Sequence, residues 1–299
     1  MSYSLHVGDA LTLLRAMTSE SVHCVVTSPP YWRMRDYKVA GQIGMEETLQ
    51  EYMERLLAVF TEVRRVLHPA GVMWLNLGDR YAASHRGSER WTDETLRHMR
   101  SRGALRNRSA ISPGFADKQL IGLPWRVALA LQDSGWYLRS DVIWHKPNAK
   151  PESVADRPTV AHEYVFLLSK SERYFFDWWA IREPQSEHER TRRLREQKKG
   201  LATVYELKRD REWFGQVVHG ATSCFRGVDA RQQLALSGYR RRRSVWSISA
   251  QGYRDGNHFA TFPVQLAELC AAGFGSVLRN GNCRGISPAA RSRLSRFRP

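Results

Sequence analysis

The chain has 299 residues, a mass of 34.5 kDa and an apolar content of 42%, which is enough for one large α/β domain with an appended module. Its formal net charge of +16 and pI of about 10.1 favour a polyanionic partner. We expect a cytoplasmic protein without a membrane span, leader or metal site, because no apolar run reaches about 18 residues and the four cysteines lack metal-ligand spacing.

The first predicted elements are a short strand over residues 3–7 and an amphipathic helix that runs to Met17. Gly8-Asp9-Ala10 forms the turn between them, where the Asp9 carboxylate can cap the helix. A second strand is predicted over 21–27, because this run is rich in β-branched residues, as a buried parallel strand is.

Ser28-Pro29-Pro30-Tyr31 follows this strand directly. The two prolines fix φ and end the strand, so that Ser28 and Tyr31 lie at its carboxyl end, where open α/β sheets bind their ligands. A hydroxyl, a proline carbonyl and an aromatic ring on one stiff turn are suited to hold an amino group on a flat heterocycle. A strand-ending turn without a binding role is the alternative.

The next segment predicts a helix over 48–67, whose apolar residues recur at three and four spacing. Pro69-Ala70-Gly71 is expected to stop this helix, and a strand follows over 72–77. Asn76 and Asp79 then lie at the carboxyl end of another strand. They either face the same pocket as Ser28 or serve as capping and turn residues.

Periodicity disappears from residue 80 to residue 118, and residues 84–110 carry seven arginines against three acids. This stretch is predicted to be a mobile basic lid or a disordered insertion. A helix is predicted over 120–131 and a strand over 135–144, followed by His145-Lys146-Pro147-Asn148. Residues 161–170 and 173–177 are predicted to be paired strands joined by a short polar turn.

Composition shifts between residues 182 and 243, where sixteen lysines and arginines stand against eight acids, with aromatic residues between them. Four consecutive arginines end this segment: Arg240, Arg241, Arg242 and Arg243. So dense a cluster favours phosphate contacts over an ordinary solvated surface. Further on, Pro263 is placed for the first turn of a helix whose Leu266 and Leu269 face inward.

These motifs together resemble the β class of amino-DNA methyltransferases. Ser28-Pro29-Pro30-Tyr31 is similar to the family's motif IV, and Phe262-Pro263 to its motif X, with a basic region between them. The resemblance implies an α/β, Rossmann-like, permuted S-adenosylmethionine-dependent methyltransferase fold with an inserted basic recognition region. Residues 1–181 would form the catalytic half, 182–245 the target-recognition region, and 246–299 a cofactor-side helix and an Arg-rich tail.

The resemblance further implies methyl transfer from S-adenosyl-L-methionine to the exocyclic amine of a flipped base in double-stranded DNA. Ser28 and the Pro29 carbonyl would orient the amine, and the Tyr31 ring would stack on the base, so that Tyr31→Phe is expected to be nearly silent. Serine in place of aspartate at the start of Ser-Pro-Pro-Tyr favours cytosine-N4 over adenine-N6 as the target, with adenine-N6 as the alternative.

Binding roles follow from the same resemblance. Asp9 and Ala10 would contact the adenosine end of the cofactor, and Phe262-Pro263 its methionine end. Lys146 and the four arginines from Arg240 to Arg243 would contact DNA. A cognate restriction endonuclease is a candidate partner, and the oligomeric state is left open.

The family pattern fails after Leu278. A Val-Leu-Asp-Pro-Phe-x-Gly-Ser-Gly turn that grips the cofactor is expected, but the chain reads Arg279-Asn-Gly-Asn-Cys-Arg-Gly285, and residues 279–299 hold six arginines and no acid. The rival hypothesis is therefore a catalytically inactive, truncated DNA-binding remnant that binds DNA but not S-adenosylmethionine. An RNA-binding module ranks below both, because the usual RNA-binding motifs are missing from the sequence.

Overall fold

The computed structural model describes residues 4–82, 112, 114–189, 191–192, 238–251 and 262–273. The chain divides into two compact units, residues 1–172 and 173–299. The predictions for the basic stretch over 84–110, for most of the recognition region and for the Arg-rich tail lie outside the described residues. The three functional regions predicted from the sequence remain a prediction.

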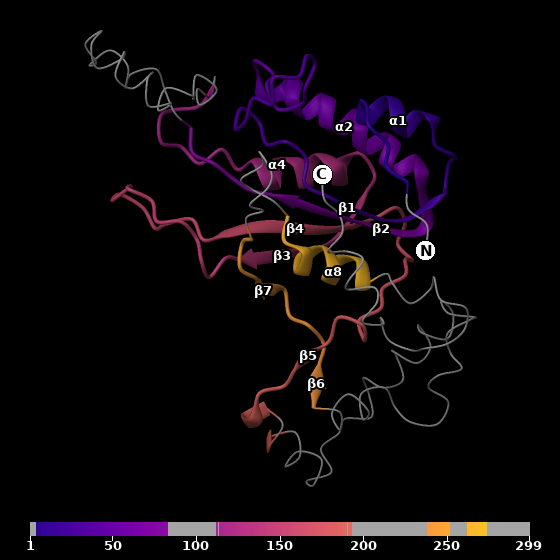
Figure 1. The fold of residues 1–299 in the computed structure, drawn as a ribbon, viewed down its shortest axis with the longest axis vertical. Coiled ribbons are helices and arrows are strands. Elements are labelled where there is room, and N and C mark those ends of the chain that lie inside the picture. The colour runs from indigo at the N-terminus through magenta and orange to yellow at the C-terminus, as the bar shows by residue number, and fades with distance from the viewer. Residues whose placement is uncertain are drawn as a thin grey trace. The chain divides into compact units, whose positions relative to one another are not determined.

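The first unit is built on a mixed β-sheet in which the strands lie in the order β1-β2-β4-β3 (Figure 1). β1 pairs with β2 in parallel, whereas β4 pairs with β2 and with β3 in antiparallel fashion. The strands are β1 (Val22–Thr27), β2 (Leu67–Leu77), β3 (Tyr137–His145) and β4 (His162–Ser169). Because β1 and β2 are parallel neighbours, their carboxyl ends bring Ser28 and Asn76 to the same edge of the sheet.

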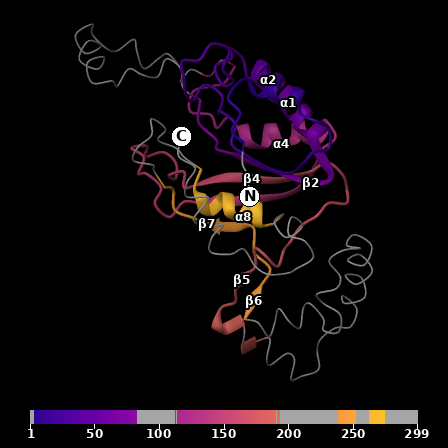
Figure 2. The same cartoon turned by 45° about the vertical axis from the view of Figure 1, so that its right-hand side comes forward.

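Three helices cover one face of this sheet: α1 (Ala10–Ala16), α2 (Leu49–Val66) and α4 (Leu123–Asp133). They lie on the same side in both views (Figure 1 and Figure 2). Thr48 and Glu51 form a capping box at the start of α2. The core between α2 and β2 contains buried apolar side chains at helical and alternating spacing, including Leu56, Phe60, Met73 and Leu75. Each such burial contributes about 1.5–3 kcal/mol to folding.

The boundary between α2 and β2 differs from the prediction. The helix ends at Val66 and the strand begins at once with Leu67, so that Pro69-Ala70-Gly71 lies inside β2. The pairing register with β1 shifts between Val22 and Cys24 in this stretch. A Cβ on Gly71 would lie 2.8 Å from the His23 carbonyl oxygen, so glycine is required where the two backbones approach.

Two predicted strands are wrong. Residues 4–7 form no strand and are exposed, with Leu5 and Val7 more than four-fifths accessible, because no described strand lies beside them to bury an alternating face. Residues 173–177 form no strand either. β4 instead pairs with β2 and β3, whose apolar side chains bury it between two neighbours.

The labelled elements of the second unit are three short strands and the helix α8, and residues 187–189 and 191–192 are also helical. β5 (Glu183–Pro184) pairs with β6 (Tyr239–Arg240), and β7 (Val245–Ser247) and α8 (Val264–Ala272) follow. The predicted helix after Pro263 is confirmed, with Leu266 buried and Leu269 half-buried. Across the described parts of both units, no helix is long and apolar enough to cross a membrane.

Candidate functional site

The turn after β1 is held in place by α2 and by the loop between the turn and α2. The Tyr52 hydroxyl donates a hydrogen bond to the Pro30 carbonyl (2.9 Å), and the indole of the fully buried Trp32 donates to the Glu46 carbonyl (3.1 Å). The Pro29 carbonyl, in contrast, accepts no hydrogen bond from any described residue. Ser28 is exposed. The turn therefore presents a hydroxyl, and a proline carbonyl that no described residue occupies, on a fixed backbone.

Ser28 and Tyr31 of this turn meet Asn76 of β2 and Glu163 of β4 in one cluster of polar side chains. Glu163 Oε2 accepts hydrogen bonds from the Tyr31 hydroxyl (2.8 Å) and from Asn76 Nδ2 (2.7 Å). Asn76 Nδ2 also lies 3.0 Å from the Tyr31 hydroxyl oxygen and 3.4 Å from Ser28 Oγ. Ser28 Oγ and the Tyr31 hydroxyl are 3.3 Å apart. Residues separated by up to 135 positions thus form one hydrogen-bonded network at the carboxyl ends of β1 and β2.

Lys146 joins this network through the second carboxylate oxygen of Glu163. It follows β3 directly and forms an ion pair with Glu163 Oε1, while its ammonium lies 4.4 Å from the centroid of the Trp144 ring. The side chains of Lys146 and Glu163 are 21% and 18% exposed. The half-buried Lys146 ammonium pairs with the Glu163 carboxylate, whose other oxygen accepts the hydrogen bonds from Tyr31 and Asn76. Lys146 therefore supports the site in the first unit.

The Gly78 backbone packs directly against the network. A Cβ at this position would lie 2.9 Å from Tyr31 Cε2 and 3.2 Å from Glu163 Cδ. Asp79 turns the other way, and its Oδ1 accepts hydrogen bonds from the amides of Arg80 (2.8 Å) and Leu123 (3.1 Å). Asp79 therefore anchors the start of α4, which is the capping role that the sequence left open.

Burial raises the pKa of two groups at this edge of the sheet, Tyr31 and Asp79. Desolvation raises the pKa of Tyr31 well above its usual value, and the neighbouring Glu163 carboxylate raises it further. The tyrosine is therefore a neutral hydroxyl that can donate one hydrogen. Burial likewise raises the pKa of Asp79, although hydrogen bonds from the Arg80 and Leu123 amides oppose this shift.

With this geometry established, comparison with known proteins identifies the family. A family model described as DNA methylase, of the N6/N4 methyltransferase type, matches residues 22–271. The chain belongs to the N6/N4 DNA methylase family.

Two curated relatives of this methylase have similar sequences. The Type II methyltransferase M.XycI of Xanthomonas campestris pv. cyanopsidis is 42% identical over 267 residues, which are 89% of this chain and 71% of the relative. The Type II methyltransferase M.SmaI of Serratia marcescens is 39% identical over 269 residues, covering 90% of this chain and 74% of the relative. The predicted family is therefore confirmed.

A solved structure confirms the predicted fold. The match to the PvuII DNA methyltransferase (cytosine-N4-specific) spans 91% of this chain and 70% of the PvuII chain. The two structures superpose with a TM-score of 0.51 at 18% sequence identity. Mixed α/β architecture with a parallel pair ending at the candidate site agrees with the methyltransferase fold expected from the sequence.

Asp9 and Ala10 lie in the first unit of the methylase, at the start of α1. Asp9 Oδ1 accepts hydrogen bonds from the Thr12 amide (2.9 Å) and hydroxyl (2.8 Å), so the predicted N-cap is confirmed. These bonds, the amide bond foremost, lower the pKa of Asp9. Phe262 and Pro263 belong to the second unit, where Pro263 is buried at the start of α8. Their predicted roles at the cofactor remain predictions.

The four arginines of the second unit have different surroundings. Arg240 forms ion pairs with Glu183 (2.8 Å) and Glu189, and its side chain is 13% exposed. Arg242 is half-buried and donates to the Ile181 carbonyl (2.7 Å). Arg241 is exposed and lies 5.0 Å from the centroid of the Trp178 ring, and Arg243 is 69% exposed beside Glu183. Phosphate contacts by these arginines remain a prediction, which exposure favours most for Arg241 and Arg243.

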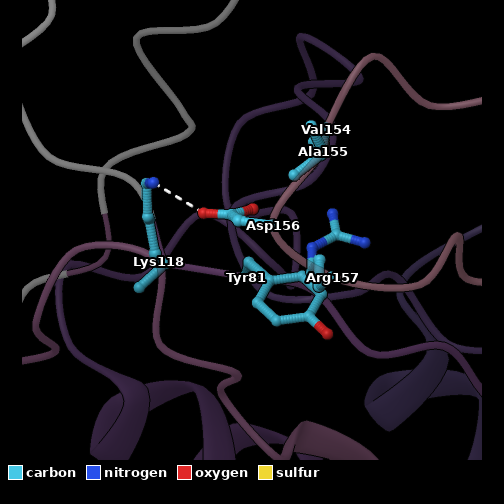
Figure 3. A pocket seen from close by; sticks show the side chains of 7 residues that line it. Tyr81, Lys118, Val154, Ala155, Asp156 and Arg157 are labelled. Atoms are coloured by element: carbon cyan, nitrogen blue, oxygen red, sulfur yellow. Dashed lines mark hydrogen bonds and ion pairs between the residues drawn. The ribbon is translucent and has the colours of Figure 1, made fainter.

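A hollow of about 570 Å³ lies elsewhere on the first unit (Figure 3). Lys118 points toward Asp156 across it, with a 2.7 Å ion pair, and the Arg157 guanidinium lies 3.8 Å from the centroid of the Tyr81 ring. Both cations are thus engaged by neighbours from the chain itself, Arg157 also by Glu152.

No sequence motif indicates a role for Glu163 or Gly78, although both contact Tyr31. Glu163 lies 17 positions after Lys146 in the sequence, and only the antiparallel pairing of β3 and β4 brings the two side chains together. The signal available in the sequence was an acid at the start of an otherwise apolar strand. Such a residue is costly to bury without partners and therefore indicates a polar network.

Proposed function

We propose that this methylase transfers a methyl group to the exocyclic amine of a base flipped out of double-stranded DNA, and that the base is cytosine, methylated at N4. The observation that carries the proposal is the pair of acceptors on the turn after β1. Ser28 Oγ is exposed, and the Pro29 carbonyl accepts no hydrogen bond from a described residue, whereas the adjacent Pro30 carbonyl is already bonded to Tyr52. The preference for cytosine over adenine rests on serine at position 28.

The residues of the turn act by positioning. Two acceptors on a rigid backbone bind the two hydrogens of an amine and thereby direct its lone pair away from the turn. The Tyr31 ring supports the plane of the base, and base–aromatic stacking contributes about 1–3 kcal/mol. Neither role needs a covalent bond between the enzyme and the base.

S-adenosylmethionine is the cofactor that family membership supports, and it supplies the methyl group as an electrophilic sulfonium. Asp9 fits its adenosine end, because Asp9 is exposed and only Oδ1 is used in the helix cap, which leaves Oδ2 as an acceptor for a polar group. Ala10 would lie against the same end. Phe262, half-buried before Pro263, offers an apolar contact for the methionine end.

Double-stranded DNA is the partner that the proposed reaction requires, and the excess of positive charge supports it. Because the proposed substrate is cellular DNA, we infer that the methylase acts in the cytoplasm of a bacterial cell, such as those from which the relatives come. The Type II relatives also make a cognate restriction endonuclease the natural functional partner.

The target atom is tested by incubating the 299-residue chain with DNA and S-adenosylmethionine and analysing the digested nucleosides by mass spectrometry. We expect N4-methylcytosine. N6-methyladenine alone would overturn the assignment of the base but keep the reaction class. Ser28→Ala should lower the methylation rate by about tenfold or more, since it removes one of two amine acceptors, while DNA binding stays within about twofold.

Titration calorimetry tests the rival hypothesis of an inactive DNA-binding remnant. Saturable S-adenosylmethionine binding at tens of micromolar protein supports the enzyme. DNA binding without cofactor binding and without methylated nucleosides supports the remnant, whose cofactor turn would be replaced by residues 279–285. Asp9→Asn, which keeps a cap acceptor but removes the charge, should weaken cofactor binding if the proposed contact exists.

A further inference from the structure

The hydrogen bonds around Ser28 can be assigned a direction by counting hydrogens. A neutral tyrosine has one hydroxyl hydrogen, and the 2.8 Å contact with Glu163 Oε2 uses it, because a carboxylate held by Lys146 can only accept. Asn76 must present its Nδ2 to the same oxygen at 2.7 Å, since its Oδ1 there would face another acceptor. The Tyr31 oxygen is therefore left to accept.

This assignment decides the state of Ser28. At the 3.3 Å contact between Ser28 Oγ and the Tyr31 oxygen, the tyrosine has no hydrogen left, so the serine is the donor. The single hydrogen of Ser28 then points inward, toward the network. Asn76 Nδ2, at 3.4 Å, occupies no more than one lone pair of Ser28 Oγ. The remaining lone pair of this exposed residue is available to accept a hydrogen bond from a ligand.

We propose that Glu163 is a positioning residue which, through Tyr31, fixes the Ser28 hydroxyl as a hydrogen-bond acceptor and so selects bases that present an exocyclic amine over bases that present a carbonyl. The inference rests on the proposed function and adds a cause for its specificity. A serine hydroxyl can otherwise rotate and donate to a carbonyl as readily as it accepts from an amine. With its hydrogen held inward, a carbonyl at the same place meets only lone pairs, which disfavours uracil or thymine.

The direction of the chain also strengthens the acceptor. Successive hydrogen bonds from Ser28 to Tyr31 to the Glu163 carboxylate polarise one another, which places more negative charge on Ser28 Oγ. Asn76 is 2% exposed, so water competes weakly for the inner hydrogen bonds of the network. Tyr31 then has two separate tasks, one for its ring and one for its hydroxyl, and Tyr31→Phe is no longer expected to be silent.

The test measures binding and needs no turnover. A binding site is selected from a random pool of duplex DNA with the full chain, and each cytosine of the site is placed in turn opposite an abasic position, where flipping breaks no base pair. The same oligonucleotides are made with uracil, which carries a carbonyl in place of the amine. The wild-type chain should prefer cytosine at one position. Glu163→Gln and Tyr31→Phe should each reduce that preference by about tenfold, the weight of one hydrogen bond.

Two comparisons separate orientation of the serine from mere support of the fold. Glu62→Gln is the matched control, because Glu62 is 20% exposed and ion-paired with Arg65 on α2, outside the network; it should leave the preference unchanged. Ser28→Asp supplies a carboxylate, which accepts hydrogen bonds however its neighbours are oriented. In that background the added Glu163→Gln should change the preference by less than about twofold, whereas a residue that only supports the fold would cost the same in both backgrounds.

Each outcome decides the matter. An unchanged preference in Glu163→Gln, an equal loss in the Ser28→Asp background, or an equal loss in Glu62→Gln would each overturn the relay while leaving the methylase function standing. A wild-type chain that enriches no DNA sequence overturns DNA recognition itself, and the relay with it.

Discussion

The turn after β1 and the arginine segment that begins at the end of β6 are both groups of neighbouring residues, yet their side chains are held differently. At the turn, Tyr31 is bonded by Asn76 and Glu163, which come from β2 and β4. In the arginine segment the four side chains carry the same charge, but Arg240 and Arg242 are drawn into contacts within the second unit. The proposed role of the turn depends on fixed positions, whereas the predicted phosphate contacts of the arginines depend on how much charge remains exposed.

The largest expected effect breaks the fixed geometry of the turn. Gly78→Ala places a Cβ 2.9 Å from Tyr31 Cε2 and 3.2 Å from Glu163 Cδ, so the ring or the carboxylate must move. A displacement of this kind is expected to lower the methylation rate by about a hundredfold. The measurement is the single-turnover rate with a saturating DNA site.

Gly78→Ala should leave DNA binding within about twofold, because no arginine of the second unit is touched. A rate close to that of the wild type would show that the Tyr31–Glu163 contact tolerates movement. It would also remove the contrast between a fixed turn and an adaptable charged segment.

The sequence predicted the turn because its determinants are local. Two prolines after a β-branched run fix the end of a strand whatever its neighbours are, and the same holds for Asp9, which caps α1 through the next turn of its own helix. The partners of Tyr31 could not be predicted in this way. Glu163 lies 132 positions away, and its place depends on the antiparallel pairing of β4 with both β2 and β3, which no local pattern specifies.

The same reasoning explains the wrong strands. Residues 3–7 and 173–177 have suitable β propensity, but a strand forms only where a neighbouring strand satisfies its backbone. β4 obtains two neighbours and is buried over five consecutive residues, whereas Leu5 and Val7 are exposed. The different surroundings of the four arginines could not be predicted either, because the acids at positions 183 and 189 become their neighbours only when β5 pairs with β6.

A smaller effect is expected for stability in the second unit. Arg240→Ala removes ion pairs to Glu183 and Glu189, and should lower the free energy of unfolding by about 1 kcal/mol and the melting temperature by about 2 °C. A double-mutant cycle with Glu189→Gln, measured by thermal unfolding, should show that the two substitutions are not additive. Additive effects would mean that Arg240 is as available to DNA as its exposed neighbours.

The smallest effect is a change in salt dependence, and it tests the gradation among the arginines directly. Each phosphate contact contributes about 0.9 to the slope of log affinity against log salt. If all four arginines contact phosphates, replacing them together with alanine should reduce the slope by about 3.6; if only the exposed pair does so, the reduction is about 1.8.

In the second case, the double variant Arg241→Ala, Arg243→Ala should reproduce the slope of the quadruple variant. The double variant Arg240→Ala, Arg242→Ala should leave the slope unchanged while lowering the melting temperature. Because Arg240 is 13% exposed and Arg243 69% exposed, we expect the lower figure. A reduction near 3.6 would show that DNA displaces Glu183 and Glu189 from Arg240.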